Sequence, residues 1–211
     1  RYSAPVVLYD DNDNLAVRAA DALTRIGYVD IRILEGGASA WEAAGFTLYQ
    51  GVNVPSKTFG ELVEHLCHTP AITASELHEM QMRGDNLILL DGRTPEEYIN
   101  FNIPGGISCP NAELPLRFDA LVNDSETTVV INCAGRTRSI IGAQTLIDFG
   151  ISQKVFALEN GTQGWALIDL ELEKGADRFA PEMLSNATLE MAQLRAKNLA
   201  KSQDIAFVDY G

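Results

Sequence analysis

The chain has 211 residues, 46% of them hydrophobic, and a formal net charge of −13 at pH 7. This length fits one large or two ordinary domains, and the acidic balance argues against nucleic acid or an anionic membrane surface as a partner. No apolar run is long enough to cross a membrane. The three cysteines Cys67, Cys109 and Cys133 form no disulfide framework and indicate a reducing compartment, which we expect to be the cytoplasm.

Residues 1–50 alternate between strand and helix patterns. Val6 to Tyr9 and Ile31 to Leu34 read as buried strands, and Leu15 to Ile26 reads as a helix that ends at Gly27. A further short helix is expected up to Ala44. The segment therefore predicts part of an α/β domain.

Residues 51–70 form a connector, within which Phe59 to His68 predicts a short amphipathic helix. His65, Cys67 and His68 lie close in sequence, but a helix spreads them around its circumference, whereas a metal needs three or four converging ligands. We therefore expect no metal site, and no cofactor is predicted for the chain.

Residues 71–176 predict one complete domain. A helix capped by Thr73 or Ser75 is expected to run to Arg83, and proline after Thr94 marks the start of another. Strands and helices alternate throughout, which favours a three-layer α/β/α fold around a mainly parallel sheet. The other expected strands are 87–90, 107–109, 128–131 and 155–158, and the other helices are 113–121, 141–150 and 164–170.

Residues 177–211 predict a linker, a helix over Leu189 to Leu199 and a strand over Ile205 to Asp209. The same order, helix then strand ending in aspartate, leads up to Asp91 in the complete domain. The tail is therefore expected to be the front of a further repeat.

The stretch V-V-I-N-C-A-G-R-T-R-S-I-I-G places Cys133 between a buried strand and a helix. Loop amides and the helix N-terminus both direct positive charge at this position. Together with Arg136 and Arg138 they favour a thiolate, so Cys133 is predicted to be a nucleophile. Ser139 is expected to cap the helix and to contact the loop. Cys109 is expected to be a half-buried strand residue rather than a second redox thiol.

The loop C-A-G-R-T-R-S and the upstream run L-L-D-G-R-T-P-E-E-Y-I-N-F-N-I-P-G-G resemble the rhodanese (sulfurtransferase) family over about Thr73 to Lys174. The resemblance implies a rhodanese-like fold and transfer of a sulfane sulfur through Cys133, from an anionic donor such as thiosulfate to cyanide or a thiol. It further implies that Asp91 and Arg93 support the active-site loop and that Glu97 and Tyr98 are structural. Asn102 stands where the family often has a histidine before I-P-G. The implied substrate-binding residues are those of the loop, Ala134, Gly135, Arg136, Thr137, Arg138 and Ser139.

An internal repeat relates residues 6–44 to the Cys133 half, at a spacing of about 123 residues. L-E-G-G-x-x-x-W at Leu34 to Trp41 matches L-E-N-G-x-x-x-W at Leu158 to Trp165. Asp10 stands where Cys133 stands, so the first copy is predicted to be inactive. Because this copy lacks a front half, the chain is expected to be a fragment of a tandem rhodanese-like protein.

Two other functions compete with sulfur transfer. Cysteine phosphatases, with which we group arsenate reductases, use a C-x5-R loop, whereas here the sixth residue after Cys133 is Ser139 and the arginine falls at the fifth. A non-catalytic docking module is the other alternative. The incomplete ends are further expected to pair, within one chain or in a homodimer.

Overall fold

The computed structural model describes residues 2–46 and 55–206. The chain divides into two units, Arg1–Asn53 and Val54–Gly211, and each is described by itself.

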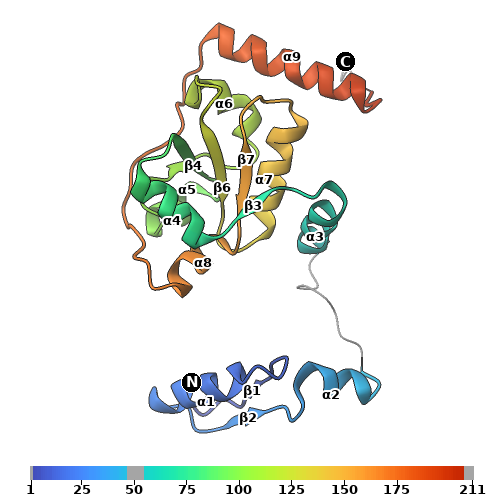
Figure 1. Cartoon of the computed structure of the whole chain (residues 1–211), viewed down its shortest axis with the longest axis vertical. Coiled ribbons are helices and arrows are strands. Elements are labelled where there is room, and N and C mark those ends of the chain that lie inside the picture. The colour runs from blue at the N-terminus through green and yellow to red at the C-terminus, as the bar shows by residue number, and fades with distance from the viewer. Residues whose placement is uncertain (1, 47–54, 207–211) are drawn as a thin grey trace. The chain divides into compact units, whose positions relative to one another are not determined.

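The second unit is built on a five-stranded sheet in which every pair of neighbouring strands is parallel (Figure 1). Its order is β3-β7-β6-β4-β5, so the longest strands lie at the centre. Parallel strands joined by helices bring all their carboxyl ends to one edge of the sheet. The strands are β3 (Ala71–Ile72), β4 (Leu87–Asp91), β5 (Ile107–Ser108), β6 (Thr128–Asn132) and β7 (Val155–Leu158).

Helices cover both faces of this sheet, as the sequence predicted. One face packs against α6 (Leu114–Leu121), α7 (Thr137–Asp148) and Val63 of α3 (Pro55–Cys67). The opposite face packs against α4 (Ala74–Arg83) and Trp165 of α8 (Gly161–Leu167). The expected three-layer α/β arrangement with a parallel sheet is therefore confirmed for this unit.

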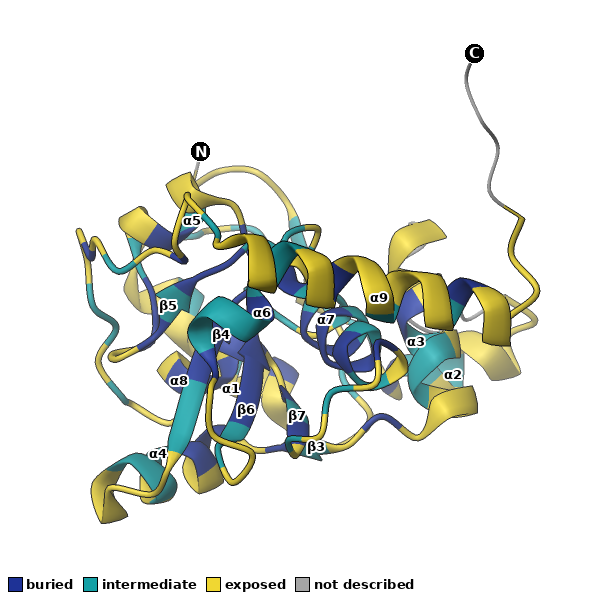
Figure 2. Cartoon of the chain, turned by 90° about the horizontal axis from the view of Figure 1, so that it is seen from above, coloured by how far each residue is buried: buried dark blue, intermediate teal, exposed yellow. Residues whose placement is uncertain are grey.

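The central strands are apolar because both their faces are buried (Figure 2). Leu90 of β4 and Ile131 of β6 are 0% exposed. Truncating either one to alanine is expected to cost about 2–5 kcal/mol of stability. The sheet thus gives rigid support to the residues at its carboxyl edge.

Two capping boxes fix helix starts. Thr73 Oγ1 accepts from Glu76 N at 3.2 Å while Glu76 Oε2 accepts from Thr73 N at 2.7 Å. Thr73 rather than Ser75 is therefore the cap of α4. Thr94 and Glu97 make the same reciprocal pair at the start of α5 (Pro95–Asn100), with distances of 3.4 and 3.2 Å.

Several helix boundaries differ from the sequence prediction; α3, for example, begins at Pro55 rather than Phe59, and two other differences concern helices next to Cys133. The α8 helix begins at Gly161, three residues earlier than expected, because Asn160 and Gly161 adopt positive φ and turn the chain directly into the helix. The α7 helix begins at Thr137, so Ser139 lies inside it rather than at its cap. The start of each helix depends on the backbone conformation, and a pattern of apolar residues does not reveal backbone conformation.

The tail forms α9 (Asn186–Ser202), longer than the helix predicted there. It packs on α6, where Arg195 Nη1 donates to Asp119 Oδ2 at 2.6 Å and Ala192 is buried. Residues 205 and 206 are not in a strand, and the remainder of the strand expected over Ile205 to Asp209 lies outside the described residues. The helix is thus confirmed, whereas the assignment of the tail to the front of a further repeat stays a prediction.

The first unit consists of β1 (Val6–Leu8), α1 (Leu15–Arg25), β2 (Ile31–Ile33) and α2 (Gly37–Ala43). Its two strands pair in parallel, with Val6 opposite Ile31. Among its described residues only Ala16 and Gly37 are buried. A second five-stranded sheet is absent from the described part of this unit, so the structure contains one complete domain rather than two.

Within the described residues, no helix is both long and apolar enough to cross a membrane.

Candidate functional site

The candidate site lies where β6 ends and α7 begins, at the carboxyl edge of the parallel sheet. Cys133 directly follows β6 and is 2% exposed. Ser139, one helical turn into α7, donates from Oγ to Cys133 Sγ at 3.2 Å. The prediction that Ser139 contacts the loop is confirmed, whereas the prediction that it caps the helix is wrong. The thiol is therefore held in a defined position at the N-terminus of a twelve-residue helix.

Two backbone amides at the start of α8 bind carbonyl groups of the Cys133 loop. Thr162 N donates to the carbonyl of Cys133 at 2.8 Å, and Gln163 N donates to the carbonyl of Ala134 at 3.1 Å. In a trans peptide the carbonyl and the following N–H point in opposite directions. The N–H groups of Ala134 and Gly135 therefore point away from α8, which leaves them free to face an anion at the loop.

Close backbone packing makes this arrangement specific. Gly161 has a φ of +48°, and a Cβ atom at this position would lie 2.1 Å from the carbonyl oxygen of Cys133. No side chain fits there, and few residues other than glycine adopt that conformation. Gly161 thus allows α8 to approach the loop closely enough to bind its carbonyls.

Asp91 and Arg93 form a buried pair behind the loop. Arg93 Nε and Nη2 donate to the two carboxylate oxygens at 2.9 and 2.7 Å, and both side chains are 1% exposed. Asn132, the residue before Cys133, donates from Nδ2 to Asp91 Oδ2 at 3.1 Å. Arg93 also donates to the carbonyl of Phe101 at 2.6 Å. The pair connects β4 to the residue that precedes the thiol, without contacting the thiol itself.

The two loop arginines are both paired with glutamates from outside the loop. Arg138 donates from both terminal nitrogens to Glu97 of α5, at 2.7 and 2.8 Å. These hydrogen bonds lower the pKa of Glu97 to about 2 and raise the pKa of Arg138. Arg136 donates from Nη2 to Glu64 of α3. Sequence analysis expected both arginines to be available to a substrate; it named Glu97 only as a structural residue and predicted neither ion pair.

Asn111 also contacts the loop and was not identified by sequence analysis. Its Nδ2 donates to the carbonyl of Arg138 at 2.8 Å, next to Ser139. A Cβ atom on Gly92 or Gly142 would lie 2.0 or 2.6 Å from its Oδ1, so the side chain fills a slot between two glycines. The only hint in the sequence was Gly142, which lies in the interior of α7, where glycine is destabilising unless something packs against it.

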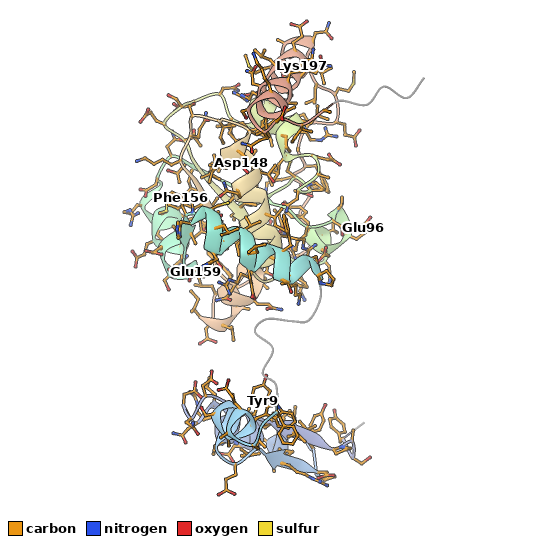
Figure 3. The ribbon with its side chains drawn as sticks, turned by 90° about the vertical axis from the view of Figure 1, so that its right-hand side faces the viewer. Tyr9, Glu96, Asp148, Phe156, Glu159 and Lys197 are labelled. Atoms are coloured by element: carbon orange, nitrogen blue, oxygen red, sulfur yellow. The ribbon has the colours of Figure 1, made fainter. Side chains whose placement is uncertain are left out.

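A cavity of about 260 Å³ lies beside the loop, between α3, α7 and the ends of β3 and β7. Its floor is apolar, with Ala71, Ile140 and Ala157. Its charged lining residues are Glu64, Arg136 and Glu159, the last of which is labelled in Figure 3.

The remaining cysteines lie apart from this chemistry. Cys109 is 0% exposed, rather than half-buried as predicted, and burial raises the pKa of its thiol to about 12. It therefore stays protonated, which argues against a second redox thiol. Cys67 is exposed near the end of α3. Among the described residues there is no group of three or more histidine, cysteine, aspartate or glutamate side chains placed to bind a metal ion.

With this geometry in view, comparison with known proteins identifies the fold family. The sequence matches the Rhodanese-like domain family over residues 1–44 and 73–167. The chain belongs to the rhodanese-like family. The match includes the Cys133 loop, both supporting residues Asp91 and Arg93, and the loop around Asp10.

This rhodanese-like chain matches only part of each of the relatives that follow. A crystal structure of a thiosulfate sulfurtransferase from Pseudomonas aeruginosa is 46% identical with a TM-score of 0.70, over 95% of this chain and 38% of that chain. The Mycobacterium tuberculosis protein SseB is 32% identical over 124 residues, which are 54% of this chain and 43% of SseB. The HTH-type transcriptional regulator Rv0324 from the same organism is 33% identical over 106 residues, 50% of this chain and 46% of the regulator. The chain thus spans less than half the length of each of these relatives.

Proposed function

We propose that the chain is a sulfurtransferase that carries a sulfane sulfur on Cys133. The observation that supports this most directly is the position of the Cys133 thiol, held 3.2 Å from the Ser139 hydroxyl at the N-terminus of α7. A negative charge on sulfur is favoured there by the helix dipole and by free amides. The thiolate is the reactive form of cysteine, and the same surroundings would accommodate the charge of a persulfide.

The proposed cycle has two displacements on sulfur. In the first, the Cys133 thiolate attacks the sulfane sulfur of thiosulfate; an S–S bond to Cys133 forms, the S–S bond of thiosulfate breaks, and sulfite leaves with the electron pair. In the second, cyanide or a thiolate attacks the outer sulfur of the persulfide, and the electron pair of that S–S bond returns to Cys133. The sulfur passes between nucleophiles through a covalent intermediate and no external oxidant is needed.

The surrounding residues receive separate roles in this proposal. The amides of Ala134, Gly135 and Thr137 bind the anionic donor and the persulfide, and Ser139 hydrogen-bonds the reacting sulfur. Arg136, which is more exposed, attracts the donor. The bidentate pair with Glu97 favours a positioning role for Arg138, and the buried pair of Asp91 with Arg93 supports the same role for those residues.

The relatives support the choice of donor. The 46% identical structure from P. aeruginosa is named a thiosulfate sulfurtransferase. The loop argues against the phosphatase alternative, because phosphatases need arginine where this chain has Ser139, and here that serine is bound to the sulfur.

Mass spectrometry tests the proposal directly. After incubation with thiosulfate, the peptide that contains Cys133 should gain one sulfur, and thiosulfate should turn over far faster than an aryl phosphate. Cys133→Ser should abolish both the added sulfur and the transfer to cyanide, while the control Cys109→Ser should retain them. A Cys133→Ser protein with full transfer activity, or preferential phosphate hydrolysis by the unmodified chain, would overturn the proposal.

We also propose that residues 1–44 are an inactive counterpart of the Cys133 half. Two equivalent contacts support this: Ala38 N donates to the carbonyl of Asp10 at 3.1 Å, as Thr162 N does to Cys133 at 2.8 Å. Gly37 has a φ of +59°, and a Cβ atom there would lie 2.0 Å from the Asp10 carbonyl oxygen, which repeats the environment of Gly161.

The contacts of the Asp10 carboxylate support the proposed inactivity. Its two oxygens accept from Ala16 N and Asn12 N, each at 3.0 Å, and the bond from Ala16 is the main cause of its lowered pKa. A fixed negative charge thus occupies the anion position at the start of α1. The Asp10 carboxylate would thus occupy the place of an anionic substrate in this loop.

A further inference from the structure

The two arginines of the Cys133 loop are held with unequal strength. Arg138 makes two parallel hydrogen bonds with Glu97, and Glu97 is itself fixed by its capping box with Thr94. Bidentate pairs of this kind are the strongest ion pairs, and they fix geometry. Arg136 instead reaches Glu64 through one nitrogen, and its side chain is 54% exposed. An incoming anion can therefore displace the glutamate partner of Arg136 more readily than that of Arg138.

Glu64 is presented by a helix that is fixed against the loop. Gly60, one turn earlier on α3, packs so closely that a Cβ atom there would lie 2.6 Å from Thr137 Cγ2. Val63 packs against the core on the same helix. Figure 3 shows α3 crossing α7, and the two helices are in contact. The side chain of Glu64 is 28% exposed, and its carboxylate is held beside Arg136 rather than free in solvent.

The charges around Arg136 are predominantly negative. The cavity next to the loop brings Glu64 and Glu159 to the same space as the Arg136 guanidinium. A dianion such as thiosulfate that binds Arg136 must displace Glu64 from it, and it would then meet the negative charge of Glu159, which lines the same cavity as Arg136. Like charges at short range repel, the more strongly where water is partly excluded.

We propose that Glu64 is a specificity-determining residue, which competes with the donor for Arg136 and weakens the binding of doubly charged donors. This inference rests on the proposed function, in which Arg136 attracts the donor. It assigns Glu64 to the selection of substrates and leaves the chemistry at Cys133 unaffected. Donors with a lower charge are then favoured relative to thiosulfate.

The substitution Glu64→Gln tests the proposal, because it removes the charge and keeps the shape of the side chain. The KM for thiosulfate should fall about three- to tenfold, the range expected for removing one nearby charge at a partly exposed site, while kcat changes little. The matched control is Glu61→Gln, which removes the same charge from the same helix where no contact with Arg136 is made; its KM should stay near that of the unmodified chain. In an Arg136→Gln background, Glu64→Gln should have a smaller effect, because the competition for Arg136 is gone and only the direct repulsion of the donor remains.

A binding measurement separates this proposal from the proposed function. In proteins carrying Cys133→Ser, which cannot turn over, thermal shift with thiosulfate should show tighter binding when Glu64→Gln is added. Tighter binding without any turnover by the Cys133 protein would support the role of Glu64 and overturn the sulfurtransferase proposal. An unchanged KM in Glu64→Gln, in a chain that does transfer sulfur, would overturn the role of Glu64 alone.

Discussion

The reactive position of Cys133 depends on residues that never touch the sulfur. Asn132 connects it to the buried Asp91–Arg93 pair, and Asn111 holds the carbonyl of Arg138, next to the serine that binds the sulfur. Each contact fixes one end of the loop. Because small displacements of reacting groups reduce rates strongly, we expect these residues to act as positioning residues in the proposed sulfur transfer.

Asn111→Ala should reduce sulfur transfer without unfolding the chain. Loss of one hydrogen bond costs about 1 kcal/mol of stability, but it frees the Arg138 carbonyl and with it the position of Ser139. We expect kcat to fall about tenfold, since misplacement of this size affects the reaction more than binding. The rate of Cys133 alkylation should fall in parallel.

The matched control is Asn123→Ala, which removes an exposed asparagine from the same unit. It should leave kcat and the alkylation rate unchanged. If Asn111→Ala kept the activity of the unmodified chain, Asn111 would be a packing residue only.

At the scale of single elements, most strands and the starts of α4 and α5 could be predicted because their signals are local. The capping boxes at Thr73 and Thr94 are readable from four residues each, and the buried strands from their apolar runs. The start of α8 could not be read this way, since it depends on positive φ at Asn160 and Gly161. Glu64, Glu97 and Asn111 meet the loop only after folding, from positions distant in sequence, so sequence analysis could identify the loop but not its partners.

Helix α5 is tied to the loop by a pair whose strength depends on pH. The pKa of Glu97 is lowered to about 2, chiefly by its hydrogen bonds with Arg138. A carboxyl group with a lowered pKa in the folded state stabilises the fold above its unfolded pKa, and this contribution is lost as pH falls toward the folded value. The stabilising effect of Glu97 should therefore be complete near neutral pH and decline between about pH 5 and pH 2.

Glu97→Gln tests this pH dependence by urea denaturation. The difference in unfolding free energy between the unmodified chain and the variant should be largest near neutral pH and smaller at about pH 3. Because the pair is more than one-third exposed, the difference should be modest. Glu96→Gln, at the neighbouring exposed position, is the control and should show no such trend. A difference that grew on acidification would contradict the assignment of the lowered pKa to Glu97.

At the scale of the whole molecule, the two units differ in how well they can support a reactive group. The second unit surrounds its central strands with helices on both faces, and α9 adds cover over α6. The first unit buries only Ala16 and Gly37 among its described residues and leaves Val7, Tyr9 and Val29 exposed. Both units place a strand, a loop and a helix in the same order. The chemical difference between them therefore lies in the residues of the loop.

A thiol alone is not expected to make the first unit active. Asp10→Cys, introduced together with Cys133→Ser, places a thiol at the end of β1. The loop after it contains Asp11 and Asp13 and, unlike the Cys133 loop, no arginine. Nearby negative charges disfavour a thiolate and repel anionic donors. We therefore expect no sulfur transfer from thiosulfate to cyanide above the level of the Cys133→Ser protein.

Two measurements make this result interpretable. Circular dichroism should show that the double variant retains its secondary structure, and alkylation should show that the introduced thiol is accessible, so that inactivity reflects its surroundings. Asp10→Ser in the same background serves as the control without a thiol. Appreciable transfer by the double variant would mean that the strand end and helix N-terminus suffice, and that the cations and amides around Cys133 contribute less than we infer.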